Sequence, residues 1–144
     1  MNAPAPRILL VEDDPVIRDL VTDVLSSRGW QVLACAHLPD AVDVAQLRPE
    51  AVVLDLRLPS GRDGADLLAE MRATPGARLI PVVVCTGDGL RAEADAARFA
   101  ALGAAVVIKP FDLDDLVGAV TANVGARFNR LRMAAAPAAD GPPR

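Results

Sequence analysis

The stretch that decides the fold is RILLVEDDP, at residues 7–15. Its four consecutive aliphatic residues, 8–11, predict a strand that is buried on both faces, as in a parallel sheet. Acidic residues follow the strand at once, and Asp14 and Pro15 then begin a helix, with Asp14 as its N-cap and Pro15 at its first position. A strand that leads directly into a helix is the repeating unit of an α/β fold.

Similar units follow along the rest of the chain, where short apolar runs alternate with segments of helical period. This alternation predicts a parallel sheet with helices on both of its faces. Beyond the first strand we expect strands at 31–36, 51–54, 80–85 and 105–108, and helices from 15 to a stop at Gly29, at 39–47, 65–72 and 90–102, and from 113 onward. The apolar stripes that should face the sheet are Ile17, Leu20, Val21, Val24 and Leu25 in the first helix, and Leu113, Leu116, Val117, Val120 and Val124 in the last.

The bulk composition is that of one globular domain with an aliphatic core. The chain has 144 residues, 52% of them hydrophobic and 3% aromatic, and a net charge of −4. We expect a folded domain over residues 6–126, a flexible N-terminus at 1–5, and a helix extension with a disordered Ala/Pro-rich tail at 127–144. The acidic balance does not favour nucleic acid as a direct partner.

No signal peptide and no apolar run long enough to span a membrane is present in the sequence, so we expect a cytoplasmic protein that does not bind membranes. The two cysteines, Cys35 and Cys85, fall in predicted buried strands and lack the spacing of a metal site, so we expect neither a disulfide nor a thiolate centre. The only histidine, His37, is predicted to lie in a surface loop, so no histidine-based triad can form within the chain.

Polar side chains stand at the ends of four predicted strands. Glu12 and Asp13 follow the first strand, Asp55 follows the third, Thr86 the fourth and Lys109 the fifth. Open parallel sheets gather their functional residues at the carboxyl ends of the strands. We therefore expect these five residues to form one pocket for an anion and a metal ion.

Lys109 is the only lysine among fifteen basic residues, and the other fourteen are arginine. A single exception at a strand end indicates that this position needs a slim point charge that reaches into a crowded pocket. The Lys109–Pro110 bond is a candidate for the cis form, because a turn there would aim the lysine inward.

The three carboxylates suggest a metal-assisted phosphoryl acceptor. Side by side, Glu12, Asp13 and Asp55 would repel one another unless a cation joined them, and oxygen ligands favour Mg²⁺. Asp55 can act as a nucleophile that forms an acyl phosphate, the Thr86 hydroxyl can donate to a phosphoryl oxygen, and Gly87 would let the backbone approach it. The simpler interpretation is that the acids merely cap a helix and a turn, and that Thr86 is an ordinary strand residue.

Four motifs in order resemble the receiver domain of two-component response regulators: residues 8–14 (ILLVEDD), Val53-Leu54-Asp55 with Leu58-Pro59, Thr86-Gly87, and Lys109-Pro110-Phe111. The resemblance covers about residues 6–126. It implies a flavodoxin-like (βα)5 fold, a three-layer sandwich with a five-stranded parallel sheet in the order 2-1-3-4-5.

The resemblance also implies a phosphorelay role for this pocket. By it, Asp55 is phosphorylated by a histidine kinase or a phosphotransfer protein, and Thr86 and Lys109 hold the phosphoryl oxygens. Asp13 would ligate Mg²⁺ directly, Glu12 mostly through water, and the backbone carbonyl of Arg57 would complete the protein ligands.

The sequence departs from the family where a rotating aromatic usually reports phosphorylation, because that place is held by Val106 and the chain has no tyrosine. Any signal must then travel by shifts of residues 86–88 and the following helix, or by charge alone. Arg57 and Asp88 occupy the positions that tune hydrolysis in such domains. Their opposite charges suggest a pair at the pocket mouth that slows self-dephosphorylation.

The leading functional hypothesis is a stand-alone receiver without an output domain, with no enzymatic activity beyond weak self-phosphorylation and self-dephosphorylation. It would signal to a protein partner or pass the phosphoryl group onward, and its fourth helix, fifth strand and last helix would form the face for partners or for a homodimer. A phosphatase that uses Asp55 as nucleophile would need an acid at residue 57, where arginine stands. A phosphorylation-independent binding module is the other alternative, although it has no reason to keep clustered acids.

Overall fold

The computed structural model describes residues 5–56, 63–109 and 112–135, with side chains up to Val124. Its five strands are β1 (Arg7–Val11), β2 (Gln31–Cys35), β3 (Ala51–Asp55), β4 (Val82–Thr86) and β5 (Ala104–Ile108). Its helices are α1 (Pro15–Ser27), α2 (Ala41–Leu47), α3 (Gly64–Ala73), α4 (Gly89–Ala94), α5 (Ala96–Ala101) and α6 (Leu113–Ala135). The expected tail beyond α6 and residues 1–4 lie outside the described part of the chain.

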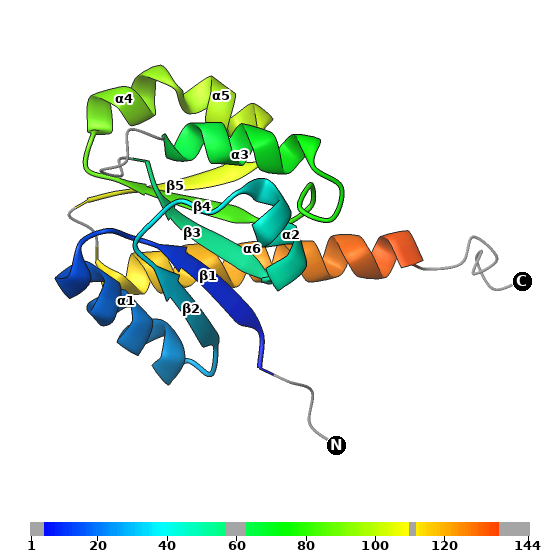
Figure 1. The fold of residues 1–144 in the computed structure, drawn as a ribbon, viewed down its shortest axis with the longest axis horizontal. Coiled ribbons are helices and arrows are strands. Elements are labelled where there is room, and N and C mark those ends of the chain that lie inside the picture. Colours follow the sequence, from blue (N-terminus) through cyan, green and yellow to red (C-terminus); the bar gives the residue numbers. More distant parts are fainter. Residues whose placement is uncertain (1–4, 57–62, 110–111, 136–144) are drawn as a thin grey trace, which may run out of the picture.

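All five strands are parallel and lie in the order β2-β1-β3-β4-β5 (Figure 1). This confirms the predicted order of a flavodoxin-like fold. In the register, Val11 of β1 lies beside Leu54 of β3, and Thr86 of β4 lies beside Ile108 of β5. The residues that follow β1 and end β3 therefore meet at the same edge of the sheet.

Helices cover both faces of the sheet, with α1 and α6 on one side and α2 to α5 on the other (Figure 1). The alternation of side chains along each strand divides the core in two. Ile8 and Leu10 of β1 pack toward α1 and α6, while Leu9 and Val11 pack toward α2, α3 and α5. Each fully buried aliphatic side chain of this kind stabilises the fold by about 1.5–3 kcal/mol.

The predicted start of α1 is confirmed. The Asp14 side chain accepts hydrogen bonds from the backbone N–H of Val16 and Ile17, and Pro15 is the first helical residue. Within the predicted stripe Val21 and Leu25 are buried, but Leu20 is 49% exposed. Leu20 lies about 100° around the helix from Val21, at the edge of the buried face.

Two differences from the predicted elements have identifiable reasons. The expected helix at 90–102 is two helices, because Asp95 (φ −99°, ψ 10°) leaves helical geometry between α4 and α5 and aspartate is a poor helix former. The fourth strand begins at Val82 rather than Ile80, because the Ile80 N–H bonds back to Ala77 and Pro81 has no N–H to donate to a ladder.

The other predicted elements are confirmed to within about two residues of their ends. Neither cysteine forms a disulfide; Cys85 is buried, whereas Cys35 is only partly so because β2 lies at the edge of the sheet. His37 is exposed, as predicted. Among the described helices, none combines the length and apolar character that a membrane crossing requires.

Phe99 tests the packing of α5 against the sheet, because it is 1% exposed and belongs to the core cluster on that side. We predict that Phe99→Ala lowers the free energy of unfolding by about 3–5 kcal/mol, through lost burial and the cavity left behind. Urea unfolding followed by circular dichroism measures this. Leu90→Ala is the control, because Leu90 is 82% exposed and its loss should change stability by less than about 0.5 kcal/mol.

Candidate functional site

Three carboxylates meet at the carboxyl edge of the sheet. Glu12 and Asp13 follow β1 and Asp55 ends the neighbouring strand β3. One oxygen from each of the three lies within 4.8 Å of the others. Glu12 is only 3% exposed and Asp55 8% exposed, whereas Asp13 is partly open to solvent. The arrangement is therefore a small, all-oxygen pocket with one open side.

Lys109 reaches this pocket from the end of β5, across β4. Its Nζ donates to Asp55 Oδ2 at 3.0 Å and to the two carboxylate oxygens of Glu12 at 3.1 and 3.2 Å. Its backbone N–H donates to the carbonyl of Thr86 at 2.7 Å, which holds the base of the side chain against β4. One ammonium group thus offsets the repulsion between two buried carboxylates.

The pocket shifts the acid–base behaviour of its members. Burial raises the pKa of Glu12 to about 7, an effect that the hydrogen bond from Lys109 opposes and the charge of Asp55 reinforces. Burial lowers the pKa of Lys109, but its hydrogen bonds to Asp55 and Glu12 outweigh burial and leave the pKa above its ordinary value. Lys109 is therefore cationic at neutral pH, while Glu12 exchanges a proton near neutrality.

Thr86 and the residues after it form another wall of the site. Thr86 is 1% exposed, and its Oγ1 accepts a hydrogen bond from the backbone N–H of Asp88 at 3.1 Å. The Asp88 carboxylate in turn accepts from the N–H of Arg91 at 2.9 Å and begins α4. A Cβ at Gly87 would meet no other atom within 4 Å, so the predicted need for glycine there rests on a bound phosphoryl group, not on the protein alone.

Two residues that the sequence analysis missed support the acids. Arg18 in α1 donates from Nη1 to the carbonyls of Glu12 at 3.1 Å and Asp13 at 3.4 Å, which orients the segment between β1 and α1. Gly64 begins α3 so close to Asp55 that an added Cβ would lie 2.5 Å from the Asp55 carbonyl oxygen. One feature of the sequence could have indicated the role of Arg18. A cation near a helix N-terminus is unfavourable, so its presence there suggests a local partner.

Three predicted features lie outside the described residues: the Arg57 carbonyl as a metal ligand, its pairing with Asp88, and the Lys109–Pro110 peptide bond. They stay predictions. Val106 on β5 is 36% exposed and too small to act as a rotating aromatic. Cys85 lies beside Asp55 in the sheet, but burial raises the pKa of its thiol to about 12, so it remains protonated.

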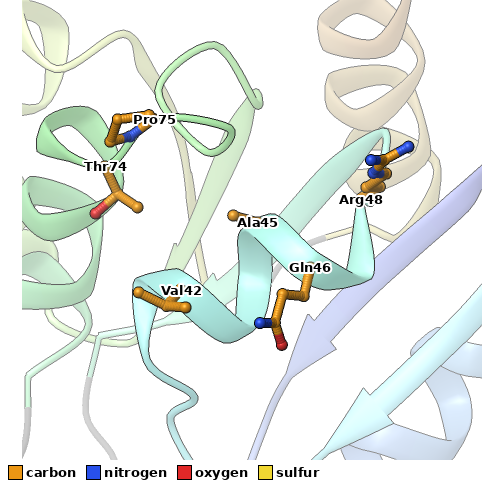
Figure 2. Close-up of a pocket in the computed structure, with 6 residues that line it drawn as sticks. All are labelled: Val42, Ala45, Gln46, Arg48, Thr74 and Pro75. Carbon is orange, nitrogen blue, oxygen red and sulfur yellow. The ribbon is translucent and has the colours of Figure 1, made fainter.

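The site is distinct from a shallow hollow between α2 and the turn after α3 (Figure 2). That hollow is lined by Val42, Ala45, Gln46, Arg48, Thr74 and Pro75. Arg48 comes shortly before β3 begins, so the hollow lies toward the amino ends of the strands. It contains no carboxylate, which separates it from the chemistry at the opposite edge of the sheet.

Comparison with known proteins identifies the family to which this arrangement of residues belongs. The sequence profile of the response regulator receiver domain matches residues 8–121. The chain belongs to the receiver domain family. Its fold matches the receiver domain of the sensor histidine kinase PA1611 from Pseudomonas aeruginosa with a TM-score of 0.68 and 28% identity, over 84% of this chain and 98% of that one. That receiver was solved with a magnesium ion coordinated in its active-site cleft.

Two curated relatives differ in how much of their length this receiver spans. The transcriptional regulatory protein PdtaR of Mycobacterium tuberculosis is 32% identical over 87% of this chain, which spans 59% of PdtaR. The sporulation initiation phosphotransferase F of Bacillus subtilis is 35% identical over 79% of this chain and 90% of its own length. The chain thus spans less than two thirds of the first relative and nearly all of the second.

The raised pKa of Glu12 predicts that metal-free protein loses stability as pH rises. Between about pH 4.5 and pH 7 the folded state keeps a proton that the unfolded state has released, so unfolding becomes easier toward pH 7. We expect a loss of roughly 1–3 kcal/mol in this window, measured by urea unfolding in the presence of a chelator. Glu12→Gln is the matched control, and the Glu12 assignment is wrong if this variant keeps the same pH slope.

Gly64 allows a test of the close contact between α3 and the backbone of Asp55. We predict that Gly64→Ala displaces the Asp55 backbone, because the new Cβ would overlap its carbonyl oxygen. Amide chemical shifts of Asp55 and Leu56 should move. Gly118→Ala, in a helix where an added Cβ meets nothing within 4 Å, should leave them in place. Equal shifts in both variants would show that the contact is unimportant.

Proposed function

We propose that this receiver is a phosphorylation-dependent signalling switch that accepts a phosphoryl group on Asp55 from a histidine kinase or a phosphotransfer protein. The observation that carries the proposal is the contact of Lys109 Nζ with both Asp55 and Glu12. This contact puts a cation beside the carboxylate that we propose as the nucleophile, which supports neutralisation of the charge on incoming phosphoryl oxygens. In the reaction an oxygen of Asp55 bonds to phosphorus as the bond to the donor's histidine nitrogen breaks.

Each residue has a defined part in this step. Lys109 balances the negative charge of the transferred group, and the Thr86 hydroxyl can donate to one of its oxygens while still accepting from Asp88. The three carboxylates match Mg²⁺, a hard cation that prefers oxygen ligands, and Asp13 is its most accessible ligand among the three. When bound, Mg²⁺ would supply further charge neutralisation at the phosphoryl oxygens.

The output is proposed to be a protein contact or onward transfer of the phosphoryl group. The similarity to sporulation initiation phosphotransferase F over 90% of its length supports a relay. The similarity to PdtaR reaches only 59% of that protein, so a transcriptional role does not follow from it. We propose no enzymatic activity beyond weak self-phosphorylation and self-dephosphorylation, and a cytoplasmic location beside the kinase.

A phosphorylation-independent binding module remains the alternative. Against it stands the energetic cost of burying Glu12 and Asp55 together, which a module without phosphoryl chemistry could avoid with apolar side chains. Nothing in the geometry favours a phosphatase, because an arginine occupies residue 57, where the leaving group would need an acid.

Intact mass after incubation with acetyl phosphate and Mg²⁺ tests the proposal. We expect the wild type to gain one phosphoryl group, and the gain to disappear in Asp55→Asn and when a chelator removes the metal. Asp66→Asn is the control, because Asp66 is an exposed carboxylate on α3 and its loss should not affect the gain. A phosphoryl group that persists in Asp55→Asn would refute the assignment of the acceptor. No gain in any protein, with a histidine phosphotransfer donor as well, would favour the binding module.

A further inference from the structure

A close ion pair joins the two segments that flank the pocket. Arg91 Nη2 of α4 lies 2.6 Å from Asp63 Oδ2, directly before α3, and the two side chains are 23% and 33% exposed. Arg91 also contacts Asp95 through Nε, at the longer distance of 3.5 Å. Helices α3 and α4 lie on the same face of the sheet (Figure 1), so this pair joins the residue before α3 to the first turn of α4.

Asp63 is connected to the acceptor through the backbone. Its Oδ1 accepts from the N–H of Ala65 at 2.8 Å and so caps α3. The N–H of the next residue, Gly64, donates to the carbonyl of Leu56 at 3.0 Å, one residue after Asp55. A displacement of Asp55 and Leu56 is therefore expected to displace Asp63 as well.

Arg91 is connected to the other side of the pocket. Its backbone N–H donates to Asp88 Oδ1, and the N–H of Asp88 donates to Thr86 Oγ1. The carbonyl of Thr86 accepts from the N–H of Lys109, whose Nζ contacts Asp55. Together these bonds form a closed ring of contacts around the pocket. The Asp63–Arg91 ion pair closes this ring at the rim of the pocket.

Helix α4 is short and buries little of its own surface. It has six residues, and Ala92 is the one among them that is buried. Leu90 is 82% exposed. An isolated helix of this length is unstable in water, so α4 depends on tertiary contacts, of which the Arg91–Asp63 pair is one.

We propose that the Asp63–Arg91 ion pair is a latch that holds α4 in place until Asp55 is phosphorylated. The inference rests on the proposed function and adds how the signal leaves the site. When Thr86 donates its hydroxyl to a phosphoryl oxygen it moves toward Asp55, and Asp88 and the start of α4 follow. The start of α4 thereby moves relative to Asp63, and loss of the Asp63–Arg91 contact releases α4 without a rotating aromatic.

The electrostatics of the pair agree with this role. Burial raises the pKa of Asp63, but the hydrogen bond and charge of Arg91 outweigh it, and the pKa lies below its ordinary value. The hydrogen bond to Asp63 raises the pKa of Arg91. Both partners are therefore charged at neutral pH. Release of α4 would alter the mostly apolar groove that it forms with α5 and β5, where Val106 and Ile108 are 36% and 48% exposed.

Asp63→Asn and Arg91→Gln test the latch, each alone and together. Asparagine keeps an oxygen that can cap α3 and removes only the charge. Without a phosphoryl donor, we expect amide hydrogen exchange in α4 to rise about fivefold in each single variant, the upper range for a partly exposed pair, with no further rise in the double variant. Exchange in α3 should not change. Asp95→Asn, which removes the longer contact of Arg91, should have a smaller effect, and Arg91→Lys should restore most of the protection.

A second measurement separates a latch from simple loosening. In the single variants, the α4 amide signals should lie on the line between the unphosphorylated and phosphorylated signals of the wild type. Unchanged exchange in α4, or additive effects in the double variant, would overturn the latch. So would signals displaced off that line.

The two proposals fail in different ways. If the wild type takes no phosphoryl group, the proposed function fails, and the exchange measurement still decides whether the pair holds α4. Suppose that the wild type is phosphorylated and that the α4 amide signals of the variants match those of the wild type both before and after phosphorylation. The latch alone is then wrong.

Discussion

The contact of one ammonium group with two buried carboxylates is the constraint on which this site depends. Glu12 and Asp55 are nearly inaccessible to solvent, and Lys109 contacts both of them, so one cation offsets the charge of two buried acids. The contact requires that β4 separate β3 from β5 by one strand width, and that the strands be parallel and end at one edge. The strand order of the fold therefore determines that Lys109 can reach Glu12 and Asp55 and balance their charges.

Around this centre, hydrogen bonds to backbone groups and one close approach of the backbone help to place the functional groups. Arg18 holds two carbonyls, Gly64 allows α3 to approach Asp55, and Thr86 receives the N–H of Asp88. None of these contacts is large in stabilising energy. Their effect is positional, and on our proposal they let the segments around Asp55 respond together to a new charge. With Val106 at the usual aromatic position, we propose that a signal leaves the site through such coupling.

Much of the fold was predictable because its signals are local. A run such as residues 8–11 can be buried on both sides only in the middle of a covered sheet, and Asp14 with Pro15 marks a helix start by bonds to the next few residues. The errors also have local causes that were underestimated, namely the break at Asp95 and the proline before β4. Leu20 was misplaced because a stripe read from spacing alone does not show where the buried face ends.

The sequence by itself determined the strands, their approximate ends, the polar residue at each end and the family to which they belong, because periodicity and motif order are properties of the chain. Only the tertiary structure decided which distant groups touch. The reach of Lys109 to Glu12 spans 97 positions, and no local pattern records it. The same holds for Arg18 on two carbonyls, Gly64 against Asp55 and Arg91 against Asp63. These contacts arise from the closure of loops around a rigid sheet, and a residue's partner there is set by distance in space and not by distance along the chain.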